Sequence, residues 1–190
     1  MMTEMLPFGR LLGLAEWDAL PEDDQHRRLE VSEGVLMMTP RPMPVHQRVV
    51  NRLAVLLDEH LPRDWSAFGE VDVLVTDEPL TIRVPDVAVT STESASANPA
   101  RFRAYDVLLV VEVLSEGTRR VDRVTKFSEY AEVGIPHYWI VEPWGKTALS
   151  AYRLGPGGYE LVSEYTGDSA IRIDGIATIP VDLDALAERK

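Results

Sequence analysis

The chain has 190 residues, carries a formal net charge of −12 and contains no cysteine. Its length suffices for one sizeable core, so we expect a single domain over residues 1–190. The lack of cysteine excludes disulfides and thiolate metal sites, and the acidic charge argues against broad nonspecific attraction to nucleic acid or anionic lipid. No segment has the roughly 18–20 uninterrupted apolar residues of a membrane helix, so we expect a soluble, cytoplasmic protein without membrane contact.

The first half of the chain mixes predicted helices and strands. An amphipathic pattern near residues 15–28 indicates a helix, and LEVSEGVLMMTP after it indicates two short strands joined by a turn at Ser32–Gly34. Apolar residues recur at helical spacing from Pro44 to Leu61, which predicts a helix. EVDVLVTDEPLTIRVPDVAVT alternates apolar and polar residues around a turn, which is typical of a hairpin or of neighbouring strands. The polar stretch Ser91–Arg103 is predicted to be a surface loop.

The second half centres on DVLLVVEVLS, a nearly continuous apolar run that predicts a strand buried on both faces in the middle of a sheet. A helix is predicted from Asp122 to Val133, ended by Gly134 and Pro136. The segments HYWIV, ALSAYRL and YELVSEY predict three further strands, followed by short strands and a last helical turn. We therefore expect an α/β or α+β domain with a central mixed sheet flanked by helices.

One carboxylate, Glu112, lies inside the buried apolar run. An unpaired carboxylate in such a place is costly, so it acquires a partner, takes up a proton or holds a metal. In the following helix, Asp122, Lys126 and Tyr130 are four residues apart and share one face. If this helix packs back across the preceding strand, Lys126 approaches Glu112 and both charges are satisfied.

A second carboxylate, Asp86 in VPDVAV, lies at the start of a predicted strand. Two acids on neighbouring strands, with a lysine opposite, can hold a divalent cation through oxygen ligands and orient a water molecule. Metal-assisted hydrolysis of a phosphodiester needs this arrangement: Mg²⁺ or Mn²⁺ polarises the phosphate and acidifies water, and the lysine stabilises the nucleophile or the developing charge.

The motifs together resemble the bacterial family of restriction-endonuclease-like proteins that is expanded in cyanobacteria, within the PD-(D/E)XK nuclease superfamily. The resemblance covers roughly Leu29 to Pro143 and is specific as a set. Its residues are Pro85-Asp86, Glu112 in an apolar strand, Asp122-x3-Lys126-x3-Tyr130, GIPHYWIVEP, and, upstream, Glu30, Gly34 and His46.

The resemblance implies a restriction-endonuclease-like fold and a role for each matching residue. Asp86 and Glu112 would bind Mg²⁺ or Mn²⁺, Lys126 would be the catalytic lysine, and Glu30 would be a further acid near the metal. His46 and Tyr130 would have secondary roles, orienting groups or contacting phosphate. One departure exists: the lysine position of the (D/E)XK pattern is Leu114 in this chain, so we interpret Lys126 as a lysine supplied from the helix instead.

Each motif also has a structural interpretation. Glu112 and Lys126 could form a buried ion pair, Asp86 could be a strand-entry acid after proline, and Asp122 is explained by the helix dipole alone. Glu30 could be a solvated strand residue, and His46 a surface histidine near a helix N-terminus.

The expected function is a Mg²⁺- or Mn²⁺-dependent DNA endonuclease. Two alternatives stay open: a binding or regulatory module that keeps the nuclease fold without cleaving, and a structural or interaction protein whose acids only satisfy the sheet. A homodimer is expected because many nucleases that cut duplexes pair two sites, and the strands ALSAYRL and YELVSEY offer a candidate edge.

Overall fold

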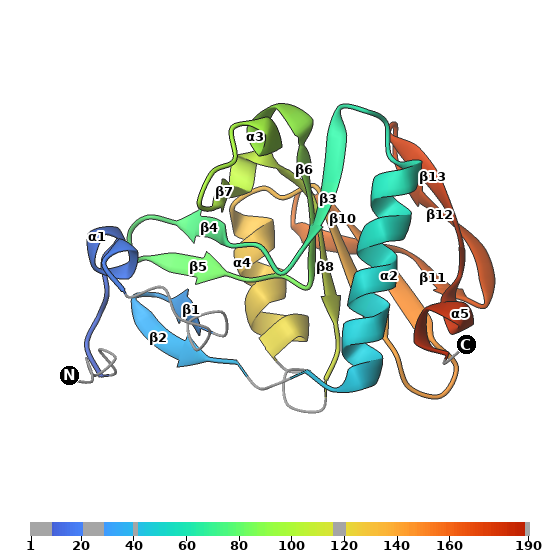
Figure 1. The fold of residues 1–190 in the computed structure, drawn as a ribbon, viewed down its shortest axis with the longest axis horizontal. Helices are drawn as coiled ribbons and strands as arrows, with labels where there is room; N and C mark the ends of the chain where they lie inside the picture. Colours follow the sequence, from blue (N-terminus) through green and yellow to red (C-terminus); the bar gives the residue numbers. More distant parts are fainter. Residues whose placement is uncertain (1–8, 21–28, 40–41, 116–120, 189–190) are drawn as a thin grey trace.

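The computed structural model describes residues 9–20, 29–39, 42–115 and 121–188, and Figure 1 shows their arrangement. In its first half the chain forms α1 (Leu14–Asp18), β1 (Leu29–Ser32), β2 (Val35–Met38), α2 (Pro44–His60), β3 (Trp65–Gly69), β4 (Val73–Thr76), β5 (Thr81–Arg83), β6 (Val87–Ser91) and α3 (Thr92–Ser96). The second half forms β7 (Phe102–Arg103), a 3₁₀ turn (Ala104–Asp106), β8 (Val107–Val113), a π-helical turn (Val121–Thr125), α4 (Lys126–Glu132), β9 (His137–Glu142), β10 (Ala148–Gly155), β11 (Gly158–Thr166), β12 (Asp168–Ile173), β13 (Ala177–Asp182) and α5 (Leu183–Ala187).

The strands form two mixed sheets and a hairpin. The larger sheet has six strands in the order β11-β10-β9-β8-β6-β3, and the smaller has five in the order β2-β1-β5-β4-β7; β12 and β13 pair with each other. Each mixed sheet contains one parallel pair, β8 with β9 and β4 with β7. With helices packed on the sheets, this architecture confirms the predicted α/β class, a mixed central sheet flanked by helices.

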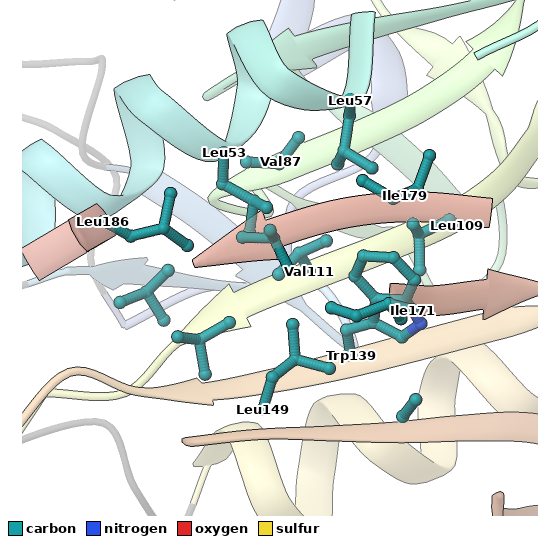
Figure 2. Packing of buried hydrophobic residues seen from close by; sticks show 14 of the residues in the cluster. Leu53, Leu57, Val87, Leu109, Val111, Trp139, Leu149, Ile171, Ile179 and Leu186 are labelled. Atoms are coloured by element: carbon teal, nitrogen blue, oxygen red, sulfur yellow. The ribbon is translucent and has the colours of Figure 1, made fainter. Parts of the chain in front are cut away.

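Strand β8 is the centre of the larger sheet, as its apolar sequence predicts. It lies between β6 and β9, and all seven of its residues are buried. One face of this sheet packs against α2, the β12–β13 hairpin and α5, where Leu53, Leu57, Val111 and Trp139 meet in the core shown in Figure 2. The opposite face packs against α4, so α2 and α4 cover the sheet from its two sides (Figure 1).

The smaller sheet brings the side chain of Glu30, in β1, to the face of α4 that carries Lys126. In β1, Leu29 and Val31 belong to an apolar cluster with residues of α1, β4 and β5, and the alternation of a strand turns Glu30 to the other face. The turn from β1 to β2 uses Glu33 and Gly34, both with positive φ, of 49° and 79°. At Gly34 a Cβ would also lie 3.2 Å from the Leu11 side chain, so glycine is required there.

Two predicted elements differ from the structure. The helix expected near residues 15–28 is present only as α1, and residues 21–28 lie outside the described part of the chain. The surface loop expected over Ser91–Arg103 is wrong in part, because it contains α3 and β7. The hydroxyl of Ser91 accepts a hydrogen bond from Ser94 N and so caps α3, and Phe102 is buried. Among the described residues, no helix is long and apolar enough to cross a membrane.

Helix α2 provides a test of the packing. Leu53 is fully buried, whereas Val55 on the same helix is 57% exposed. We expect Leu53→Ala to lower the free energy of unfolding by about 2–5 kcal/mol, because it leaves a cavity, and the control Val55→Ala to change it by less than about 0.5 kcal/mol. Urea unfolding of both variants measures the difference, and equal losses would contradict this packing.

Candidate active site

The centre of the candidate site is the buried ammonium group of Lys126. Its Nζ lies 3.0 Å from Glu30 Oε1, 3.0 Å from Glu112 Oε1 and 3.8 Å from Asp122 Oδ1. These acids come from β1, β8 and the π-helical turn, and all are buried. Three separate segments therefore place carboxylates around one lysine.

Lys126 and Tyr130 are four residues apart in α4, so both side chains lie on the face of the helix that packs against the sheet. Tyr130, one turn after Lys126, donates a hydrogen bond to Glu112 Oε1 at 3.3 Å. The hydroxyl of Tyr138 in β9 donates to the carbonyl oxygen of Asp122 at 2.8 Å, which fixes the π-helical turn before α4. Short π-helical turns are frequent at functional sites, and this one leads directly into Lys126.

Arg83, at the end of β5, joins the smaller sheet to α4. Its Nη1 donates to Glu30 Oε2 at 2.9 Å, and its Nε and Nη2 donate to the two carboxylate oxygens of Glu129 at 2.7 and 2.6 Å. Nη2 also donates to Ser32 Oγ at 2.8 Å. The guanidinium is fully buried, and such two-point pairing is the strong form of an arginine–carboxylate contact.

Asp86 lies at the same end of the larger sheet as Glu112. It directly precedes β6, which pairs with β8 in a register that sets Val87 opposite Val111. Asp86 Oδ2 accepts a hydrogen bond from Val113 N at 2.6 Å and lies 3.2 Å from His46 Nε2. His46 therefore reaches this acid from the first turn of α2, on the other side of the sheet from α4.

Burial and mutual charge shift the pKa values of these groups. Burial raises the pKa of Glu112 well above its ordinary value; Lys126 opposes this, and the neighbouring acids add to it. Burial would lower the pKa of Lys126, but the surrounding carboxylates, Glu112 first and Glu30 next, raise it, so the lysine keeps its proton. Burial would raise the pKa of Glu30, yet Lys126 and Arg83 lower it. The ionised form of Glu30 is thus favoured, whereas burial makes the charge of Glu112 costly, so a cation beside it would be stabilising.

Burial tends to lower the pKa of His46, and the hydrogen bond and charge of Asp86 outweigh that effect and raise it. A raised pKa favours the charged imidazolium beside the aspartate. His46 is only 7% exposed, so it is not the surface histidine of the alternative interpretation.

Negative charge is in excess in this network. Among the described residues its carboxylates outnumber its permanently cationic side chains, and a divalent cation would offset part of that excess. Oxygen donors suit Mg²⁺, which is commonly held by one or two carboxylates and several waters, so Asp86 and Glu112 fit such an ion. Within the described ranges, no three His, Asp or Glu side chains already converge as a metal-binding group. The network contains Glu30, Asp86, Glu112, Asp122, Glu129, Arg83, Lys126 and His46.

The structure brings Lys126 to Glu112, as the packing of the helix onto its preceding strand predicts, and it brings Glu30 and Tyr130 to the same place. Their catalytic roles stay predictions. Sequence reasoning missed Arg83 and Glu129. The sequence signal for Arg83 was an arginine within a largely apolar strand, and that for Glu129 was an acid three residues after Lys126. Neither signal indicates which residue the side chain contacts in the folded protein.

Comparisons with known proteins agree with this fold. Residues 14–182 match the Uma2 family, described as "Putative restriction endonuclease". The chain belongs to this family. A crystal structure of "a putative nuclease belonging to DUF820" from Anabaena variabilis ATCC 29413 is similar, with a TM-score of 0.71 and 18% sequence identity over 92% of this chain and 97% of that chain. At that identity the likeness shows the fold alone. Curated proteins gave no match.

The contacts of Arg83 lead to a stability prediction for this member of the Uma2 family. Arg83→Met leaves Glu30 and Glu129 without their guanidinium, and we expect it to lower the free energy of unfolding by about 3–5 kcal/mol. The control Arg153→Met removes an exposed pair with Asp174 and should cost less than about 1 kcal/mol. Chemical unfolding at about pH 7 measures both.

The cost of Arg83→Met should also depend on pH. Because the pKa of Glu30 is lowered in the folded protein, its ionised form contributes stability above its ordinary pKa of 4.5, and this contribution is lost as the pH falls through the lowered value. The stability difference between wild type and Arg83→Met should therefore be full at neutral pH and shrink in acid. A difference that stays constant down to about pH 3 would show that Glu30 is not paired as described.

Proposed function

We propose that the chain is a Mg²⁺- or Mn²⁺-dependent DNA endonuclease, with residues 1–190 acting as one nuclease domain. The observation that carries the proposal is the excess of carboxylates over cationic side chains around Lys126 among the described residues, at the end of the larger sheet where Glu112 in β8 lies beside Asp86, the residue before β6. Membership of the restriction-endonuclease-like family supports it. A cytoplasmic location is part of the same proposal.

In this proposal Asp86 and Glu112 hold the cation. Mg²⁺ or Mn²⁺ bound there would polarise the scissile phosphate and lower the pKa of a water nucleophile. Lys126 provides positive charge next to the reacting phosphate, where charge develops. His46 orients Asp86 through the contact at 3.2 Å, and Tyr130 orients Glu112 through its hydroxyl.

DNA would approach from the side of Asp86. The side chain of Asp86 is 15% exposed, against 4% for Glu112 and 7% for Lys126. Asp86 is thus the most open of the three proposed active-site groups, and the lysine lies deeper. A phosphate that reached the cation at Asp86 would meet Lys126 from the solvent side.

A second candidate is a module that keeps the nuclease fold without cleaving. The ion pairs of three arginines favour this candidate. Arg101 pairs with Asp18, Arg103 with Asp77 and Arg123 with Glu142. Arginines already bound to carboxylates release fewer counterions from DNA, so they add less to its affinity.

The deciding experiment is nicking of supercoiled plasmid and cleavage of single-stranded DNA with Mg²⁺ or Mn²⁺. We expect cleavage by the wild type and a loss on the order of 100-fold or more in Glu112→Gln and Lys126→Met, because each removes charge that acts on the reacting phosphate or its metal. The control Glu160→Gln makes the same chemical change on the exposed part of β11 and should cleave as the wild type does.

The other outcomes are informative. Equal cleavage by wild type and Glu112→Gln would point to a contaminating nuclease. If every protein, including the wild type, is inactive on both DNAs, the non-cleaving module becomes the better description.

We also propose a homodimer formed along β11. This strand ends the six-stranded sheet, and it exposes Leu161 and Val162 by 52% and 48%. An exposed edge strand with apolar side chains can pair with a second copy. We expect the wild type to sediment as a dimer and Leu161→Lys as a monomer, while Val55→Lys on α2 stays dimeric; a monomeric wild type would contradict this proposal.

A further inference from the structure

We propose that Glu30 is not a metal ligand but the anchor of Lys126: supported by Arg83, it keeps the lysine in place while Glu112 binds the cation. This inference rests on the proposed metal site and assigns separate tasks to two acids that lie at the same distance from one lysine. Glu30 and Arg83 are therefore positioning residues, which act through Lys126.

The hydrogen bonds of Glu30 support this role. Its Oε1 lies 3.0 Å from Lys126 Nζ and accepts from Val84 N at 3.1 Å, and its Oε2 accepts from Arg83 Nη1 at 2.9 Å. Both oxygens are thus committed to donors of the protein. Glu112 differs, because its contacts with Lys126 and Tyr130 both use Oε1. Its second oxygen takes no part in those two bonds.

The two sheets separate the two tasks. Glu112 lies in β8 of the larger sheet and Asp86 directly precedes the neighbouring β6, and the bond from Val113 N to Asp86 Oδ2 ties Asp86 to the same end of β8. Glu30 belongs to the smaller sheet and approaches Lys126 from there. A cation held by the pair on the larger sheet leaves Glu30 in contact with the lysine.

Arg83 fixes the anchor to the helix that carries Lys126. Its guanidinium binds Glu30 with one nitrogen and Glu129 with two, and Glu129 lies on α4 three residues after Lys126. The strand that carries Glu30 and the helix that carries Lys126 are therefore held by the same group. The lowered pKa of Glu30 agrees with a permanent anion at the anchor.

A competition follows from this geometry. Lys126 is shared between Glu30 and Glu112, at 3.0 Å from each; without the charge of Glu30 it would pair with Glu112 alone and compete more strongly with the cation for that carboxylate. Removing Glu30 should therefore weaken metal binding only while Lys126 is present. A direct metal ligand would behave differently, because its loss weakens binding whether or not the lysine is there.

The test is a double-mutant cycle read by Mn²⁺ binding. Electron paramagnetic resonance of free Mn²⁺ gives the affinity of wild type, Glu30→Gln, Lys126→Met and the double variant, without any need for cleavage. We expect Glu30→Gln to weaken binding by roughly 10- to 100-fold, a loss of the size seen when groups that act on a metal ligand without binding the metal are changed. In the Lys126→Met background we expect Glu30→Gln to weaken Mn²⁺ binding by less than about threefold, because only the loss of one nearby negative charge then remains.

Equal losses in both backgrounds would make Glu30 a ligand and overturn the inference while leaving the proposed function intact. A wild type that binds no Mn²⁺ would overturn the inference and the proposed metal site together. Circular dichroism checks that each variant is folded. Glu30→Gln keeps an amide oxygen for Val84 N or Arg83, and Arg83 keeps both bonds to Glu129, so we expect it to fold.

Wild-type protein provides a second measurement that does not depend on any variant. The anomalous signal of Mn²⁺ in wild-type crystals should lie against Asp86 and Glu112, with Glu30 still hydrogen-bonded to Lys126. A Glu30 oxygen bonded to the metal would overturn the inference.

Discussion

The burial of one ammonium group organises this structure. Lys126 is 5% exposed and lies between carboxylates from β1, β8 and the turn before α4. A buried charge is tolerated only with close, well-placed partners, so the larger sheet, the smaller sheet and α4 must be held in one arrangement. Arg83 contributes to this by binding β1 and α4 at the same time. The apolar cores position the three segments, and the ionic contacts define their relative placement.

This arrangement suits both a structural network and a metal site, and the charge balance distinguishes them. A network that only satisfied the sheet would match its acids with cations. Among the residues that the structure describes here, the acids outnumber the cations, and burial raises the pKa of Glu112 with further help from Asp122 and Asp86. Within the described part of the chain, Asp86 is held by a backbone N–H and by His46 rather than by an arginine or lysine. A divalent cation between Asp86 and Glu112 would compensate this charge, whereas a well-matched structural network would have no need of one.

Much of the centre of the site could be predicted from local sequence. The strand around Glu112 is apolar throughout, and the four-residue spacing of Lys126 and Tyr130 places both on one helix face, so a helix packed on its preceding strand brings them together. The link between Arg83 and Glu129 could not be predicted, because the two residues are 46 positions apart. Arg83 lies in the smaller sheet and Glu129 in α4. Local periodicity also could not predict α3, which Ser91 caps, since a short polar helix lacks an apolar face.

The most direct test is calorimetric titration of Mg²⁺ into the wild type, in buffers that differ in their enthalpy of ionisation. Burial raises the pKa of Glu112 and a bound cation would lower it again, so we expect saturable binding that is accompanied by proton release. Glu112→Gln should lose both the binding and the proton release. An absence of binding to the wild type, or identical binding to Glu112→Gln, would contradict a metal site at Glu112.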